Sequence, residues 1–174
     1  MKTLVIVSHP YVSQSRVIQA LQSTAEELSN TVVRNLEFLY GNPVQGFDIQ
    51  AEQSACEEAD RIVFMYPTHW FNLTPALKTW LNEVWTYGWA FGPGGNALKG
   101  KELLVVTSAG ASEYTYSHAG LVDSTMDEVL TPVRASALYV GMTFASPLAF
   151  YEVAGADQSK LQSFQSALAA RLQS

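Results

Sequence analysis

Short apolar runs recur along the chain and are separated by segments with helical spacing. The runs at residues 2–7 (KTLVIV), 61–66 (RIVFMY) and 102–107 (ELLVVT) are apolar almost throughout. Such uninterrupted runs are typical of parallel strands that are covered on both faces. Two further segments, residues 31–38 and 143–151, are rich enough in apolar and β-branched residues to predict a second and a fifth strand.

The segments between these runs have apolar residues three and four positions apart, which is the spacing of an amphipathic helix. Thr74 followed by Pro75 predicts a helix start, because threonine caps and proline suits the first turn. Pro132 predicts a kink or a restart, and Gly141 a stop. The predicted helices cover residues 15–28, 50–59, 75–85, 124–140 and 158–172.

Five strands that alternate with helices predict an α/β fold. The expected architecture is a doubly wound five-stranded parallel sheet in the flavodoxin-like order 2-1-3-4-5, with helices on both faces. The length, the absence of repeats and the absence of a linker predict one domain over residues 1–174.

Composition and charge limit the classes of partner and the location that we expect for this protein. The only cysteine, Cys56, cannot form an internal disulfide, so a reducing, cytoplasmic location is expected. The apolar run near the N-terminus is too short for a secretory signal or a membrane span. The formal net charge of −6 argues against nucleic acid as a partner. It does not exclude an anionic cofactor, because a helix N-terminus can hold a phosphate with backbone N–H groups.

The stretch GPGGNALKGKE at residues 92–102 contains the skeleton of a phosphate-binding nucleotide loop, from Gly95 to Lys101. That loop must follow a strand, open a helix and carry serine or threonine after its lysine. Here the stretch precedes a strand and Glu102 follows the lysine. We therefore interpret it as a glycine-rich connection. No G-x-G-x-x-G motif follows the first strand either.

In a doubly wound sheet the ligand binds beyond the carboxyl ends of the strands. The loop after the first strand offers His9, the hydroxyls of Ser13 and Ser15, the cation of Arg16 and a helix start, which together suit a phosphate monoester. An equally good interpretation makes Ser15 a simple helix cap and His9 a turn residue.

The loops after the third and fourth strands suit a flat ring. Trp70 and Phe71 can bracket such a ring, although packing is the commoner fate of aromatic residues. The segment Thr107–Ala111 consists mainly of small residues that allow a close approach of the backbone. A flat phosphorylated cofactor such as FMN has the matching parts.

Four stretches carry a family resemblance: HPYVSQSRV, YPTHWFNLTPALKTWLNEVW, YGWAFGPGGNALKGKELL and VTSAG. With these pieces in this order, the chain resembles the flavodoxin-like NAD(P)H:quinone oxidoreductases. Within them it is most similar to the ancillary NAD(P)H oxidoreductases of glutathione-regulated potassium-efflux systems.

The resemblance implies an FMN or FAD site, and the short chain favours FMN. It also implies NAD(P)H as electron donor, a quinone as acceptor, ping-pong hydride transfer and a homodimer. The residues expected at the phosphate are His9, Ser15, Arg16, Val17 and Ile18. Those expected around the flavin ring are Pro67, Thr68, His69, Trp70, Phe71, Thr107, Ser108, Ala109 and Gly110.

The resemblance further suggests that a tyrosine and a histidine after the fourth strand assist hydride transfer or protonate the quinone. The candidates are Tyr114, Tyr116 and His118, each of which fits a solvated loop residue at least as well. The three histidines and one cysteine lack metal-binding spacing, so no metal is expected.

The chain departs from the family pattern at two positions. Ile18 stands where the family often has asparagine, and Ala109 where it often has a second glycine. A missing polar contact and a crowded flavin edge are the expected consequences. The resemblance also leaves two alternatives open: an electron carrier of the flavodoxin type, and a regulatory module that docks on a membrane potassium-efflux transporter.

Overall fold

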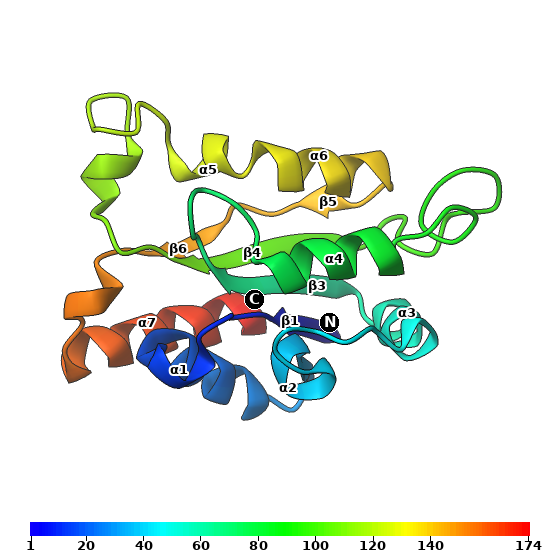
Figure 1. Ribbon diagram of the computed structural model, residues 1–174, viewed down its shortest axis with the longest axis horizontal. Coiled ribbons are helices and arrows are strands. Elements are labelled where there is room, and N and C mark those ends of the chain that lie inside the picture. Colours follow the sequence, from blue (N-terminus) through cyan, green and yellow to red (C-terminus); the bar gives the residue numbers. More distant parts are fainter.

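The computed structural model describes residues 1–174 as a parallel sheet between two layers of helices (Figure 1). The strand order β2-β1-β3-β4-β5 confirms the predicted fold class and order, and a sixth strand also pairs with β4. The strands are β1 (Thr3–Val7), β2 (Thr31–Asn35), β3 (Arg61–Pro67), β4 (Glu102–Ser108), β5 (Thr143–Phe144) and β6 (Leu148–Phe150).

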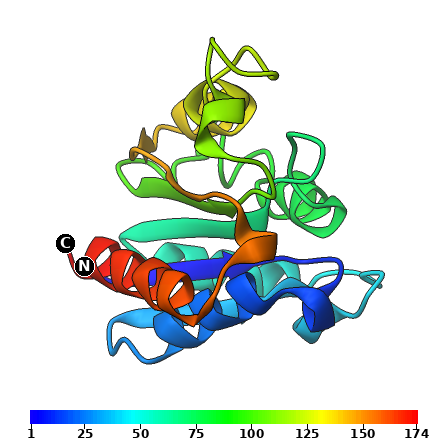
Figure 2. The same cartoon turned by 90° about the vertical axis from the view of Figure 1, so that its left-hand side faces the viewer.

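Two groups of helices cover the two faces of the sheet (Figure 2). Helices α1 and α7 pack on one face, and α2, α3, α4 and α6 contribute to the core on the other. The helices are α1 (Arg16–Glu26), α2 (Leu36–Tyr40), α3 (Ile49–Glu58), α4 (Pro75–Val84), α5 (Met126–Val129), α6 (Thr131–Tyr139) and α7 (Gln158–Gln173). No helix is both long enough and apolar enough to cross a membrane.

Strand β1 shows why the central runs are apolar throughout. Leu4 and Ile6 belong to the core on one face, and Val5 and Val7 belong to the core on the other. Successive side chains point to opposite faces of a sheet, so a strand covered twice must be apolar at every position. Each fully buried side chain of this kind contributes about 1.5–3 kcal/mol to stability.

Two predicted boundaries were wrong for local reasons, and the restart predicted at Pro132 is confirmed. The second strand ends at Asn35 rather than at residue 38, because the Asn35 side chain accepts a hydrogen bond from the Phe38 N–H and starts α2. The fifth strand is split into β5 and β6, and Pro147, which has no N–H to donate, lies in the gap. Pro132 marks a restart, since α5 ends at Val129 and α6 begins at Thr131.

The glycine-rich stretch before β4 is a connection, as its context predicted. A side chain at Gly95 would place its Cβ 2.1 Å from the Phe91 carbonyl oxygen, so close backbone packing requires glycine there. The Lys101 ammonium donates to the carbonyl oxygens of Glu57 (2.9 Å) and Ala59 (2.5 Å). The lysine therefore secures the chain next to β3 and is not available to a nucleotide.

Candidate functional site

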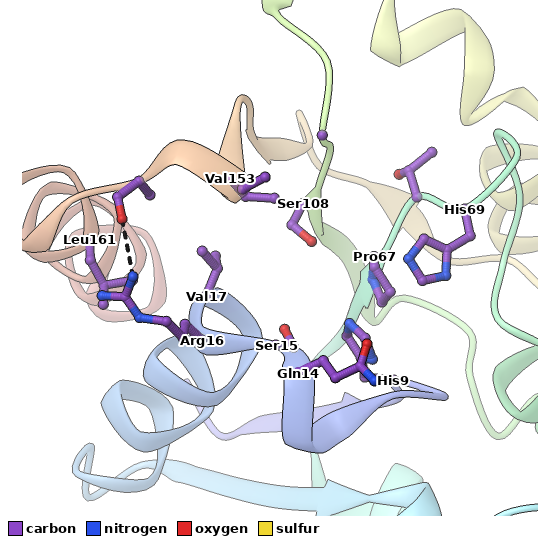
Figure 3. A pocket seen from close by; sticks show the side chains of 14 residues that line it. His9, Gln14, Ser15, Arg16, Val17, Pro67, His69, Ser108, Val153 and Leu161 are labelled. Carbon is purple, nitrogen blue, oxygen red and sulfur yellow. Dashed lines mark hydrogen bonds between the residues drawn. The ribbon is translucent and has the colours of Figure 1, made fainter.

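A cavity of about 360 Å³ lies at the carboxyl ends of β1, β3 and β4 (Figure 3). Three of its walls are the loops that follow these strands, and the fourth is the segment after β6. The lining residues are His9, Gln14, Ser15, Arg16, Val17, Pro67, Thr68, His69, Ser108, Gly110, Val153, Ala154, Ala156 and Leu161.

The start of α1 presents unpaired donors at this cavity. Ser15 caps the helix, since its Oγ accepts a hydrogen bond from the Ile18 N–H at 3.2 Å. The N–H groups of Arg16 and Val17 have no partner within the chain. Free N–H groups and the helix dipole make such a terminus attractive to anions. Ser15 therefore combines the two roles that the sequence left open: it is a helix cap and it lines the cavity.

His9 is a buried hydrogen-bond donor that faces the cavity. The residue is 8% exposed, and its Nδ1 accepts a hydrogen bond from the Tyr11 N–H at 2.9 Å. Burial, and secondarily the neighbouring His69, lower the pKa of His9 from 6.5 to about 4. The ring is therefore neutral near pH 7 with its proton on Nε2. No group of the chain accepts that proton, which leaves it for a ligand.

His69 stands next to His9 in the cavity wall. The two rings are edge to face, with centroids 5.6 Å apart. Neither ring nitrogen of His69 has a hydrogen-bond partner within the chain, and the residue is exposed. No aspartate or glutamate lines the cavity, although the chain carries a net charge of −6. The cavity is thus electrostatically suited to an anion.

Trp70 and Phe71 form the tip of a tight turn in which the Asn72 N–H donates to the His69 carbonyl at 3.2 Å. Their φ angles are +50° and +61°, a region that costs a bulky residue about 1–2 kcal/mol. Trp70 is 91% exposed, so burial does not offset this cost. The N–H groups of both residues have no partner within the chain, but neither residue belongs to the cavity lining.

The loop after β4 divides between cavity and core. Ser108 and Gly110 line the cavity, whereas Thr107 and Ala109 are turned away. The Thr107 Oγ1 donates to the Tyr66 carbonyl at 2.8 Å and contacts the Thr68 Oγ1 at 2.6 Å. Ala109 is 2% exposed and packs in the hydrophobic core. The expectation that its methyl group crowds the cavity was therefore wrong.

The side chain of Ile18 is also turned away from the cavity. Its side chain is 2% exposed and belongs to the core between α1 and the sheet. Its backbone N–H is already used by Ser15. Ile18 therefore does not line the cavity, and the substitution of an apolar residue there removes no polar group from the cavity wall.

The three candidate catalytic residues after β4 lie outside the cavity lining. Tyr116 is buried and packs against Phe71, with ring centroids 5.9 Å apart, and burial raises its pKa. Tyr114 is exposed and donates to the Ala119 carbonyl at 3.0 Å. His118 is exposed between Asp123 (3.4 Å) and Glu128 (3.3 Å). Only Tyr116 touches a residue of the predicted ring site.

Five lining residues escaped the sequence analysis: Gln14, Val153, Ala154, Ala156 and Leu161. Four of them follow the last strand, β6. Ligands of such sheets bind beyond the carboxyl ends of the strands, so the position of this segment directly after an apolar strand is the signal that points to it. The Arg16 Nη1 donates to the Ala156 carbonyl at 3.4 Å and links the segment to α1 (Figure 3).

Comparison with known proteins agrees with the fold. Residues 1–172 match the model of a family described as having a flavodoxin-like fold. General stress protein 14 of Bacillus subtilis is 40% identical over 153 residues, which cover 88% of this chain and 86% of that protein. The potassium-efflux ancillary protein KefF of Salmonella typhimurium is 37% identical over 162 residues, which cover 91% of this chain and 88% of that protein.

Solved structures with a similar fold carry several names. A general stress protein 14 from Treponema denticola in complex with FMN has a TM-score of 0.87 and 34% identity, over 98% of this chain and 99% of that one. An NADPH-quinone reductase from P. pentosaceus has a TM-score of 0.89 and 28% identity, over 98% and 97%. A structure described as a thermophilic tryptophan halogenase from Streptomycin violaceusniger has a TM-score of 0.93 and 37% identity, over 97% of each chain.

Proposed function

Because the chain belongs to the flavodoxin-like fold family, with relatives named as NAD(P)H oxidoreductases, we propose that it is a flavin-dependent NAD(P)H oxidoreductase that reduces quinones by two electrons. The names of similar proteins differ in the electron acceptor, but several share the use of NAD(P)H. An enzyme that uses this donor is expected in the cytoplasm.

The observation that carries the proposal is a cavity with unpaired donors in its wall. The buried His9 Nε2–H and the free N–H groups of α1 suit a phosphate. The turn that follows the lining residue His69 adds the free N–H groups of Trp70 and Phe71, which suit the polar edge of a flat ring. FMN has both features. The short chain favours FMN over FAD.

When bound, FMN supplies the ring that accepts and donates hydride. The chain would position that ring: His9 and the start of α1 would hold the phosphate, and the turn at Trp70 would hold the polar edge of the ring. The free backbone N–H groups of this turn would stabilise negative charge at that edge. Tyr116 packs behind Phe71 and supports the turn. The proposed order is ping-pong, in which donor and acceptor would occupy the same cavity in succession.

A homodimer is part of the proposal. A groove of about 670 Å³ between α4 and α6 is lined by Leu81, Trp85, Phe91, Tyr139 and other residues. Tyr139 is 76% exposed. Two residues close in sequence to lining residues are also exposed: Leu138, next to Tyr139, and Tyr87, close to Trp85. Exposed apolar patches of this kind are typical of protein interfaces. We expect a second copy of the chain to cover it.

The test is a visible spectrum of the purified protein mixed with FMN. Binding shifts the flavin bands, NADH or NADPH should bleach them, and a quinone should restore them. Steady-state rates at several concentrations of both substrates should give parallel double-reciprocal lines. Absence of bleaching by both nucleotides would reject the enzyme and leave an electron carrier.

A second candidate function follows from the 37% identity with KefF over 91% of this chain. A regulatory subunit of a potassium-efflux transporter would bind flavin and dock on that transporter. Co-purification with a transporter encoded nearby, together with flavin binding without turnover, would favour this candidate.

A further inference from the structure

The His9–His69 pair is more than the proposed phosphate site needs. The start of α1 already offers the free N–H groups of Arg16 and Val17. Two of the chain's three histidines nevertheless face each other in the same cavity wall. Their ring centroids are 5.6 Å apart, and Figure 3 shows both rings beside Pro67 with Arg16 on the opposite side of the pocket.

The pair cannot hold two charges while the cavity contains no anion. Burial of His9 disfavours its charged form, and each protonated ring would also repel the other at this distance. The pKa of His9 is accordingly low, about 4. A phosphate dianion next to both rings reverses this balance, because an opposite charge within a few ångströms favours the protonated form.

We propose that His9 and His69 act together as a proton-linked clamp, which takes up a proton when a phosphate monoester dianion binds at the start of α1. This inference rests on the proposed flavin site. The exposed His69 ring has both nitrogens free to bond the phosphate, and His9 contributes a second hydrogen bond through Nε2–H. The proton is assigned to the pair and not to either ring.

The surroundings of the pair are consistent with this role. Tyr11 is the other titratable side chain that faces His69, with ring centroids 6.2 Å apart, and it also lies 6.4 Å from His9. Arg16 is the only permanently charged residue in the cavity lining. Glu37 lies behind the loop, where it accepts a hydrogen bond from Ser8 at 2.8 Å, and it does not line the cavity. No carboxylate in the cavity competes with the phosphate for the protonated ring.

The test is calorimetric titration of the protein with FMN in buffers of different ionisation enthalpy at about pH 7.5. At this pH the FMN phosphate, whose second pKa is about 6, is already a dianion and takes up no proton itself. We expect an uptake of roughly half to one proton per FMN. We also expect the dissociation constant to rise with pH above 7, by at most about tenfold per pH unit. Riboflavin, which has the same ring without the phosphate, should bind without proton uptake.

Three variants locate the proton. His69→Gln keeps a hydrogen-bond donor but cannot accept a proton, so the uptake should fall to less than half. His9→Gln should weaken FMN binding and also reduce the uptake. His118→Gln, at the one histidine outside the cavity, is the matched control and should leave the uptake unchanged.

The outcomes separate this inference from the proposed function. FMN binding without proton uptake by the wild-type protein would overturn the inference and leave the flavin site intact. Uptake that persists in both His9→Gln and His69→Gln would overturn it as well. Failure of the wild-type protein to bind FMN would reject the proposed function itself.

Discussion

Glu52 and His9 are two buried polar residues that differ in one respect: whether other groups of the chain fill their hydrogen-bonding capacity. Glu52 is fully buried and is bonded by Arg34 (2.8 Å), the Tyr40 hydroxyl (2.5 Å) and the Trp80 Nε1–H (2.9 Å). His9 is almost as buried, yet its Nε2–H has no partner in the chain. Buried polar groups are normally paired, so Glu52 indicates structure and His9 a ligand site.

The difference teaches how to weigh buried polar residues when function is in question. The carboxylate of Glu52 joins β2, α2, α3 and α4, and it contributes to a single closed network. The imidazole of His9 faces a cavity that contains Arg16 and His69 but no acid. An unpaired hydrogen-bond donor at the edge of a cavity is a place where a ligand can bind.

The largest expected effect on stability comes from removing Glu52 from its hydrogen-bond network. Glu52→Ala removes the only acid near Arg34 and leaves the Trp80 N–H without a partner. We expect the free energy of unfolding to fall by about 3–5 kcal/mol, as for other broken buried ion pairs. Urea denaturation followed by tryptophan fluorescence measures it. A loss below about 1 kcal/mol would show that the network does not hold these elements together.

The complementary change is His9→Ala, which removes the buried donor that has no partner in the chain. We expect FMN affinity to fall about 10- to 100-fold, since a hydrogen bond to a charged group contributes about 1.5–3 kcal/mol. Stability without FMN should change much less than in Glu52→Ala. Fluorescence quenching of FMN measures the affinity. Equal FMN affinity in the variant and the wild type would remove His9 from the site.

A smaller effect is expected at the strained turn. Trp70→Gly allows the positive φ without steric cost and should raise the free energy of unfolding by about 1–2 kcal/mol. It also removes an exposed ring next to the cavity, so turnover with quinone should fall. Thermal melts and steady-state rates measure the two effects. Phe71 is exposed but its ring packs against Tyr116, so it is the less suitable position for this test.

The last expected effect appears only at acid pH and is a pH dependence of the stability of the protein without cofactor. The folded pKa of His9 is about 4, below its value of about 6.5 in an unfolded chain. The unfolded state therefore binds more protons between these values, and stability should fall as pH drops from about 6.5 to 4. His9→Gln should make this fall shallower. An unchanged slope in thermal melts over that range would assign the effect to other groups.

Much of the site could be predicted because it follows from strand order. Once three loops are assigned to the carboxyl ends of β1, β3 and β4, His9, Ser15, Thr68 and Ser108 become candidates by position. The parts that failed depend on side-chain direction. Ile18 and Ala109 are one residue away from lining positions, yet their side chains enter the core.

By itself, the sequence determined the parallel sheet and the edge at which the cavity lies, because hydrophobic periodicity and chain order carry that information. Only the tertiary structure decided that His9 and His69 meet, since a contact between segments far apart in the chain depends on packing. It also decided that Tyr114 and His118 lie away from the cavity and that the segment after β6 closes it. Side-chain direction at loop positions is set by backbone turns, which periodicity does not encode.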